Sequence, residues 1–237
     1  MPAAGNRGYI PPLEFIPVAE DLGKIDEIGA WSLTEACTTA ASWPGAPVIA
    51  VNISALQFTS GRLVRAVSSA LMVSELAAHR LELEITESLP LEDSPSKQHQ
   101  LRELKAQGVK ISLDDFGTGY SALNYPWRFP LDKIKIDRGF IQAIELSRSA
   151  RGVLCAIVDL GKKLDVSIVA EGVENDVQRM CLAELGCDLA QGYLFSRPVP
   201  NMDLPAIVLR DTAGSFLPAI AHAAQIEPAR RLSNAIG

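Results

Sequence analysis

The sequence has few of the residues that build thiolate or histidine metal sites. Its four cysteines, Cys37, Cys155, Cys181 and Cys187, include no C-x-x-C pair, and that spacing is typical of zinc and redox sites. Only three histidines are present, and none lies at helical ligand spacing from another. We therefore expect free buried thiols in a reducing compartment. Neither a zinc ion nor a histidine base is favoured.

Long apolar runs and a basic charge excess are also lacking. No stretch approaches the roughly 20 apolar residues of a membrane-spanning helix, and residues 1–15 do not have the basic start and apolar core of a signal peptide. The chain has 22 basic residues against 28 acidic ones, a formal net charge of −6. General nucleic-acid binders are usually basic. We expect a cytoplasmic protein with no membrane span and no general nucleic-acid binding.

Short β-branched runs alternate with longer helical patterns. The strand-like runs are residues 47–54, 81–88, 109–115, 132–137, 166–172 and 187–193. Helical patterns cover residues 61–79, 96–108, 151–164 and 175–186. This alternation predicts an α/β fold with a parallel sheet, either open and doubly wound or closed as a (β/α)8 barrel. No G-x-G-x-x-G turn follows the first strand, which removes the usual sign of a dinucleotide fold.

A polar or charged residue stands at the C-terminal end of each strand-like run. These residues are Asn52, Glu84, Asp114 with Asp115, Lys135 with Asp137, Glu171 and Gln191. In a barrel such ends meet on one face, where catalytic residues lie, so the regularity favours the barrel, although six strands are short of eight. Glu82 shares a strand face with Glu84 but is not assigned as a ligand.

The chemistry of this set indicates a site for divalent cations. Carboxylate and amide oxygens suit Mg²⁺ or Mn²⁺, and such ions would neutralise the adjacent Asp114 and Asp115. Taken alone, an Asp-Asp pair is more often a turn former or helix cap, and a lone lysine such as Lys135 is more often solvated or ion-paired. On an acidic barrel rim, Lys135 could orient a nucleophilic water. Two-metal carboxylate sites typically cleave phosphoesters, so these residues indicate a metal-dependent phosphoesterase.

Seven ordered blocks between Gly8 and Pro200 resemble the EAL domain, a family of bacterial cyclic di-GMP phosphodiesterases. They include LELEITES (81–88), LDDFGTGYSAL (113–123), DKIKIDRGFI (132–141) and QGYLFSRPVP (191–200). The resemblance implies a modified TIM barrel that uses Mg²⁺ or Mn²⁺ to linearise cyclic di-GMP to 5′-pGpG. It divides the chain into an N-terminal remnant (1–7), a barrel domain (8–210) and a helical C-terminal tail (211–237).

The resemblance also implies a two-metal site. Matching positions make Asn52, Glu84 and Asp114 ligands of the first metal. Asp114 bridges to the second metal, with Asp115 beside it, and Glu171 acts with that second metal and its waters. Asp115 and Glu171 are thereby assigned to both metal binding and catalysis.

The other matching positions have roles around the metals. The resemblance implies that Lys135 orients the attacking water and that Gln191 completes the rim. Glu87 matches the glutamate that anchors the loop after the two aspartates. Asp137, in the DKIKID block, and Glu174, the second acid of the EGVE block, are assigned to substrate binding or support.

Two departures from the family pattern bear on activity and assembly. The family's first strand carries Glu-x-Leu-x-Arg, whose Glu binds metal, but only MPAAGNR precedes Gly8. We expect a barrel that lacks or distorts its first strand, with the gap covered by the N-terminal residues, the C-terminal tail or a second chain. Pro126 stands where Leu is usual, in a helix common at the family's dimer contact. A homodimer through this helix is in doubt, because proline removes a backbone donor.

Three hypotheses for function follow from the sequence. The first is a metal-dependent cyclic di-GMP phosphodiesterase, with weak activity because one carboxylate ligand is missing. The second is a degenerate domain that binds cyclic di-GMP or a protein without cleaving it. The third is a truncated piece of an active parent. The sequence leaves all three open.

Overall fold

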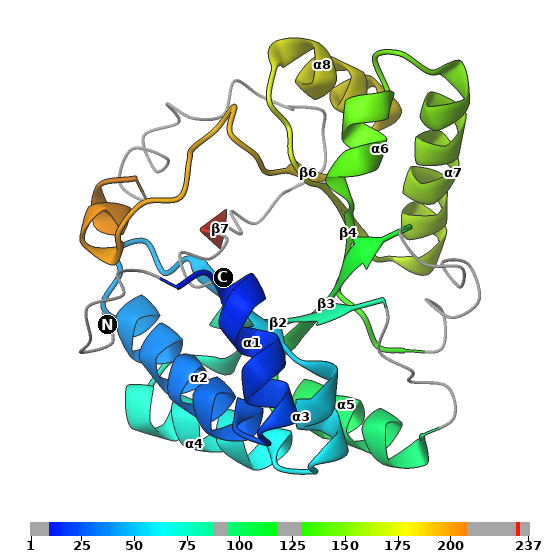
Figure 1. Cartoon of the computed structure of the whole chain (residues 1–237). Coiled ribbons are helices and arrows are strands. Elements are labelled where there is room, and N and C mark those ends of the chain that lie inside the picture. Colours follow the sequence, from blue (N-terminus) through cyan, green and yellow to red (C-terminus); the bar gives the residue numbers. More distant parts are fainter. Residues whose placement is uncertain (1–9, 88–93, 118–128, 208–230, 233–237) are drawn as a thin grey trace.

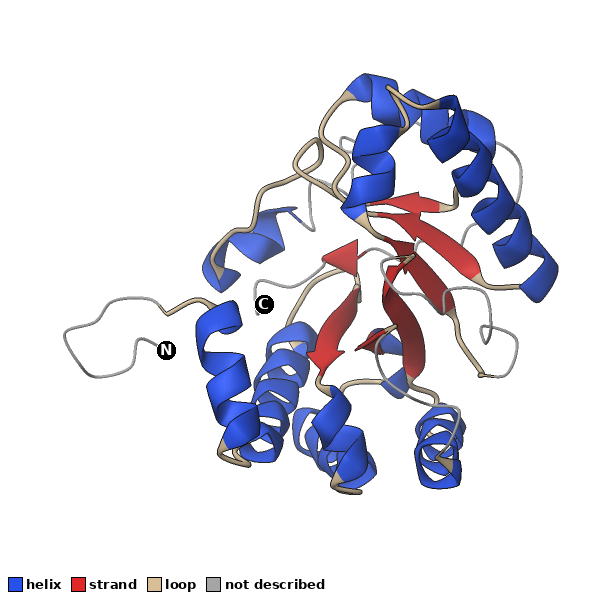
Figure 2. Cartoon of the chain, turned by 45° about the vertical axis from the view of Figure 1, so that its right-hand side comes forward, coloured by secondary structure: helices blue, strands red, loops and turns tan. Residues whose placement is uncertain are grey.

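The architecture is α/β, with one curled parallel sheet and helices around its outer side (Figures 1 and 2). The computed structural model describes residues 10–87, 94–117, 129–207 and 231–232. The strands are β1 Val48–Ile53, β2 Leu81–Thr86, β3 Lys110–Phe116, β4 Lys133–Ile136, β5 Ser167–Ala170, β6 Leu189–Ala190 and β7 Arg231–Leu232. Their order is β6-β5-β4-β3-β2-β1-β7, and every pairing is parallel. The six predicted strands and the barrel-like curl are confirmed.

Eight α-helices lie within the described residues. They are α1 Pro12–Asp21, α2 Ile25–Ala41, α3 Ala55–Thr59, α4 Leu63–Ser74, α5 Pro95–Ala106, α6 Arg138–Ala143, α7 Arg148–Leu164 and α8 Asp176–Leu185. Helix α4 is shorter than residues 61–79 because Glu75 adopts a left-handed φ of 57° at its C-cap, which ends the helix. The sequence analysis did not predict α1, α2, α3 or α6.

Local chemistry explains where the later helices begin and end. The Ser147 side chain accepts a hydrogen bond from the backbone N–H of Ala150, which caps α7, and Lys162 and Lys163 lie in its last turn. Such a cap satisfies a helix-start donor, and basic residues suit a helix C-terminus. Helix α7 thus begins and ends at signals in its own sequence.

The sheet has one apolar and one polar face. On β2 the side chains of Leu81, Leu83 and Ile85 are fully buried among helix residues of the apolar core. The alternate residues Glu82 and Glu84 are also buried, but on the inner side of the curl. Because strand residues alternate between faces, the inside of the curl is lined by ionisable groups, and the strand ends carry them to the rim.

The outer edge of β1 is covered by the C-terminal segment. Strand β7 pairs with β1 in the register Val48 to Arg231 and Ile49 to Leu232. Of the three covers predicted for this edge, the described residues thus show the C-terminal tail. Residues 1–9, residues 208–230 and the Pro126 region lie outside the described part of the chain. The helical tail and the missing first strand therefore stay predictions.

None of the helices that the structure describes is both long enough and apolar enough to cross a membrane.

Candidate functional site

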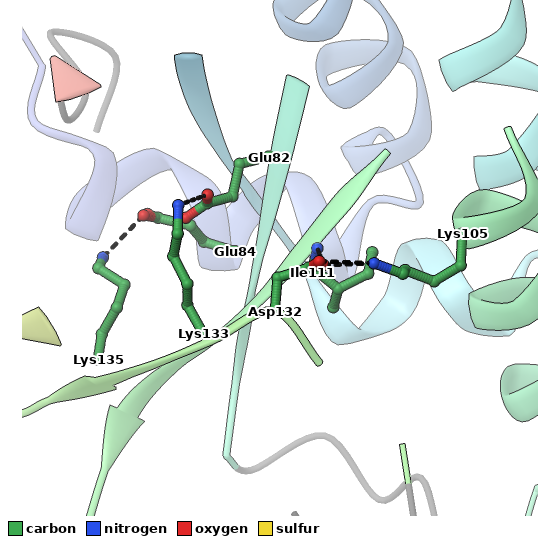
Figure 3. A network of polar contacts seen from close by, with 7 residues as sticks. All are labelled: Glu82, Glu84, Lys105, Ile111, Asp132, Lys133 and Lys135. Atoms are coloured by element: carbon green, nitrogen blue, oxygen red, sulfur yellow. Dashed lines mark hydrogen bonds and ion pairs between the residues drawn. The ribbon is translucent and has the colours of Figure 1, made fainter. Parts of the chain in front are cut away.

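The ammonium of Lys135 lies at the centre of a carboxylate cluster on the inner face of the sheet. Its Nζ is 2.9 Å from Glu84 Oε1, 3.0 Å from Asp114 Oδ1 and 2.7 Å from Glu171 Oε1. The four residues come from β2, β3 and β4 and from the end of β5. Figure 3 shows Lys135 reaching toward Glu84 from the opposite side. The structure therefore brings together four of the residues predicted from the strand ends.

A bulge in β3 explains the two adjacent aspartates. The register with β4 shifts between Leu113 and Phe116, and Asp115 has a left-handed φ of 55°. A bulge turns side chains away from strict alternation, so both aspartates can face the rim. Asp114, Asp115 and Glu171 offer carboxylate oxygens that all lie within 4.8 Å of one another. The Asp-Asp pair is thus part of a three-acid group of the kind that can hold a divalent cation.

Glu87 joins the end of β2 to the start of the loop after β3. Its Oε2 accepts a hydrogen bond of 2.9 Å from the Gly117 backbone N–H, and its own N–H donates to the carbonyl of Asp114 at 3.2 Å. Gly117 has a φ of 98°, and a Cβ there would lie 2.5 Å from the Phe140 ring. Only glycine is therefore suited to this position. The rest of the loop, residues 118–128, lies outside the described residues.

The remaining predicted residues have different surroundings. Gln191 Nε2 donates to Glu171 Oε1 at 2.7 Å, which restrains that carboxylate. Asn52 is exposed and lies in register with Glu84 on the neighbouring strand. Asp137 caps α6, accepting from the Gly139 N–H at 2.8 Å. Glu174 is exposed and directly precedes Asn175, the N-cap of α8.

The charge balance of the cluster shifts several pKa values. The pKa of Glu171 is raised to about 7, because burial and the nearby charges of Asp114 and Glu84 raise it more than Lys135 lowers it. Burial likewise raises the pKa of Glu84. For Asp115, burial and then the charges of Asp114 and Asp137 raise the carboxyl pKa. One ammonium cannot balance so many carboxylates, so the cluster suits additional positive charge.

Lys135 itself is held firmly in its charged form. Burial alone would lower the pKa of its ammonium, but the combined attraction of Glu84, Asp114 and Glu171 raises that pKa. At neutral pH Lys135 is therefore a hydrogen-bond donor with no capacity to act as a base.

Two residues of the inner face were missed as site residues. Lys133 forms a buried ion pair with Glu82. These residues come two positions before Lys135 and Glu84 on the same two strands. The Lys-x-Lys spacing of β4 and the Glu-x-Glu spacing of β2 place each pair on one face, so the signal was present in the sequence. The sequence did not show that side chains of β2 and β4, the two neighbours of β3, meet across that strand.

The donor set fits Mg²⁺ or Mn²⁺. The cluster offers carboxylate oxygens, with an amide oxygen from Asn52 on the neighbouring strand and no thiol or imidazole among its members. Hard divalent cations prefer such oxygen ligands.

Comparisons with known proteins place this chain in a family. A family model of the EAL domain matches residues 3–198. MucR of Pseudomonas aeruginosa, a bifunctional diguanylate cyclase/cyclic di-GMP phosphodiesterase, is 45% identical over 207 residues, which are 86% of this chain and 30% of MucR.

Solved structures agree with this match. The MucR phosphodiesterase in complex with cyclic di-GMP has a TM-score of 0.78 at 44% identity and covers 84% of this chain and 82% of its own. BlrP1 of Klebsiella pneumoniae, in a calcium and cyclic di-GMP complex at pH 8.0, has a TM-score of 0.74 at 29% identity and covers 80% of this chain and 48% of its own.

The match covers most of this chain but a small part of its relatives. The chain spans between 24% and 32% of the length of the curated relatives that it matches. The fold, the ordered motifs and the family model nevertheless agree over the same residues. The chain therefore belongs to the EAL domain family, the cyclic di-GMP phosphodiesterase family of bacterial signalling.

Proposed function

We propose that this chain binds two Mg²⁺ or Mn²⁺ ions and hydrolyses cyclic di-GMP to 5′-pGpG. The observation that carries the proposal is the contact of the Lys135 ammonium with Glu84, Asp114 and Glu171 at the ends of neighbouring strands. MucR is described as a cyclic di-GMP phosphodiesterase, and its solved structure contains cyclic di-GMP, which supports the choice of substrate. The calcium in the BlrP1 complex supports a divalent-cation site.

The residues that would hold the metals share oxygen donors and positions at strand ends. They are Asn52, Glu84, Asp114, Asp115 and Glu171. Bound there, divalent cations would activate water and stabilise charge on the phosphate oxygens.

The other residues position the reacting groups. Lys135, held as an ammonium, donates a hydrogen bond that orients the attacking water. Water adds its oxygen to phosphorus, the bond to the 3′-oxygen breaks, and that oxygen leaves with a proton to give a linear dinucleotide with a 5′-phosphate. Gln191 holds the Glu171 carboxylate, and Glu87 fixes the backbone at Gly117. Asp137 and Glu174 support the rim from the starts of α6 and α8.

The proposal includes an organisation for the chain. Residues 8–210 form the barrel domain, and residues 211–237 form a tail whose Arg231–Leu232 segment lies against β1. The proposal includes a homodimer. It does not assign the segment around Pro126 as the dimer interface.

An assay of the whole chain tests this function. Formation of 5′-pGpG is followed with Mn²⁺ for the parent, for Lys135→Ala and for Lys163→Ala, which removes an exposed lysine of α7. We expect the parent and the Lys163 variant to be active. Lys135→Ala should lose at least about a hundredfold in rate, because it loses the group that orients the water.

A binding measurement separates the two remaining hypotheses. Cyclic di-GMP affinity is measured with Ca²⁺ by calorimetry on the same three proteins. Tight binding by a parent that forms no 5′-pGpG would replace the phosphodiesterase proposal with the binding-module hypothesis. A parent chain that neither binds nor hydrolyses cyclic di-GMP would refute both hypotheses.

A further inference from the structure

We propose that the buried Glu82–Lys133 pair is an electrostatic floor that keeps Lys135 on the carboxylates above it. Lys133 and Glu82 neutralise each other. Lys133 therefore does not compete for the carboxylates around Lys135, and Glu82 does not attract the Lys135 ammonium away from them. One test of this inference, the affinity for Mn²⁺, rests on the proposed metal site. The other test, the crystal structure of metal-free variants, does not.

The inner face of the sheet carries two levels of charged pairs. The lower level is Glu82 with Lys133, whose side chains are 0% and 6% exposed, and the upper level is Glu84 with Lys135, at 3% and 4% exposed. Figure 3 shows both lysines rising from β4 toward the two glutamates of β2. The levels are one strand repeat apart, because alternate residues of a strand share a face.

A small residue on the intervening strand lets these pairs form. Strand β3 lies between β2 and β4. Its residue Ser112 is in register with Glu84 of the upper level on one side and with Lys133 of the lower level on the other. Ser112 is fully buried. Its short side chain leaves room for the long side chains of β2 and β4 to meet across β3.

The two levels differ in charge. At the lower level the Lys133 ammonium contacts the Glu82 carboxylate. At the upper level Lys135 meets three carboxylates, with Asp115 close by. Of the two levels, the upper one therefore has negative charge left for cations, and the balance depends on the lower level remaining neutral.

Breaking the lower pair should redirect its neighbours. Without Lys133, the Glu82 carboxylate would lose the ammonium that compensates its buried charge, which is strongly unfavourable. Lys135 lies one repeat along the same strand face as Lys133, and we expect its ammonium to turn down toward Glu82. Without the Glu82 charge, Lys133 would instead turn up toward Glu84 and compete with Lys135.

A charged pair is not needed merely to fill this space. Replacing a buried ion pair by apolar groups of similar volume is often neutral or stabilising, whereas removing one partner is costly. A structural role predicts effects on stability alone. The electrostatic floor predicts effects of opposite sign on the layer above.

The first test is a crystal structure of each metal-free variant. In Lys133→Met we expect Lys135 Nζ to leave Glu171 and approach Glu82. In Glu82→Gln, which keeps the side-chain shape, we expect Lys133 to reach Glu84. In the double variant Lys135 should keep its parent contacts, because no charge remains below it. The proposal would be overturned if, in both single variants, the remaining lysines keep the contacts that they make in the parent. If Lys133→Met does not fold, the structure of Glu82→Gln decides the question.

The second test is Mn²⁺ affinity measured by calorimetry on the same proteins. Removing or adding one nearby charge in a site of effective dielectric constant about 20 changes the affinity for a divalent cation by at least about tenfold. We expect binding at least about tenfold tighter in Lys133→Met, at least about tenfold weaker in Glu82→Gln, and equal to the parent in the double variant. Changes of the same sign in both single variants would contradict the floor.

A second ion pair of the same region supplies the control. Lys105 contacts Asp132 at 2.7 Å, and Asp132 also accepts from the Ile111 N–H at 2.8 Å. Figure 3 shows this pair directed toward α5, away from the two levels. Lys105→Met should lower the melting temperature and leave Mn²⁺ affinity unchanged. A parent chain that binds Mn²⁺ but forms no 5′-pGpG would refute the proposed catalysis. The metal-free structures and the Mn²⁺ affinities would still test the role of the Glu82–Lys133 pair.

Discussion

At the scale of single residues, Asp114 is the carboxylate on which cation binding should depend most. It contacts Lys135 and belongs to the three-acid group with Asp115 and Glu171. We expect Mn²⁺ at about 100 times its Kd to stabilise the parent by about 2.7 kcal/mol, a rise in Tm of roughly 5–10 °C for a chain of this size. Asp114→Asn should abolish that rise.

Thermal unfolding with and without Mn²⁺ measures this effect. Asp159→Asn, on the exposed side of α7, is the matched control and should keep the full rise. An Asp114→Asn protein that still responds to Mn²⁺ as the parent does would show that the other acids suffice.

Glu171 should make the metal-free chain sensitive to pH. Its pKa in the folded chain is raised from 4.5 to about 7, first by burial, so the folded state binds more protons than the unfolded state between these values. The stabilising contribution is fully present below about pH 4.5 and is lost as the pH rises toward about 7. In EDTA, urea unfolding should show that the parent loses more stability between pH 5 and pH 7.5 than Glu171→Gln does. Equal losses would mean that Glu171 does not retain a proton in the fold.

At the scale of elements, the bulge of β3 and the glycine after it should tolerate little change. Gly117 combines a φ of 98° with a close approach to Phe140. Gly117→Ala should cost about 1–3 kcal/mol for backbone strain alone, with further cost from contact with the ring, and should weaken Mn²⁺ binding through the displaced Glu87 anchor.

The same substitution in α7 should have the opposite sign. Gly152 is an exposed residue of this helix, and a Cβ added there would meet no neighbouring group within 4 Å. Gly152→Ala should stabilise the chain by about 0.5–1 kcal/mol, because glycine weakens helix interiors. Urea unfolding of both variants gives the comparison. A neutral Gly117→Ala would show that the backbone at this position tolerates a side chain without disturbing the bulge.

At the scale of the whole molecule, the sheet edge at β1 should depend on the C-terminal segment. An unpaired strand edge favours association with other chains, and β7 pairs with β1 at Val48 and Ile49. Deletion of residues 231–237 should lower the Tm and increase self-association with concentration. Light scattering after gel filtration, with the full chain as control, measures the second effect. A deleted chain with unchanged Tm and mass would show that β7 adds nothing to the edge.

The sequence by itself determined the parallel α/β sheet, its six main strands and most of the acidic rim. Periodicity and turn residues are local, so β1 to β6 and the helices α5, α7 and α8 could be predicted within a few residues. The strand-end acids Glu84, Asp114 and Glu171 followed from the same reasoning, because the C-terminal ends of parallel strands share one edge. Helices such as α2, whose burial depends on packing against α4 and β1, could not be predicted from local signals.

Only the tertiary structure decided which charges meet. The contacts of Lys135 with carboxylates of other strands, the pairing of Glu82 with Lys133 across β3, and the addition of β7 to β1 all join residues that are distant in sequence. Alternation places a side chain on a face, but the curl of the sheet and the small Ser112 determine which side chains opposite can reach it. The physical reason is that Coulomb energy depends on distance and burial, and both are set by the assembled sheet.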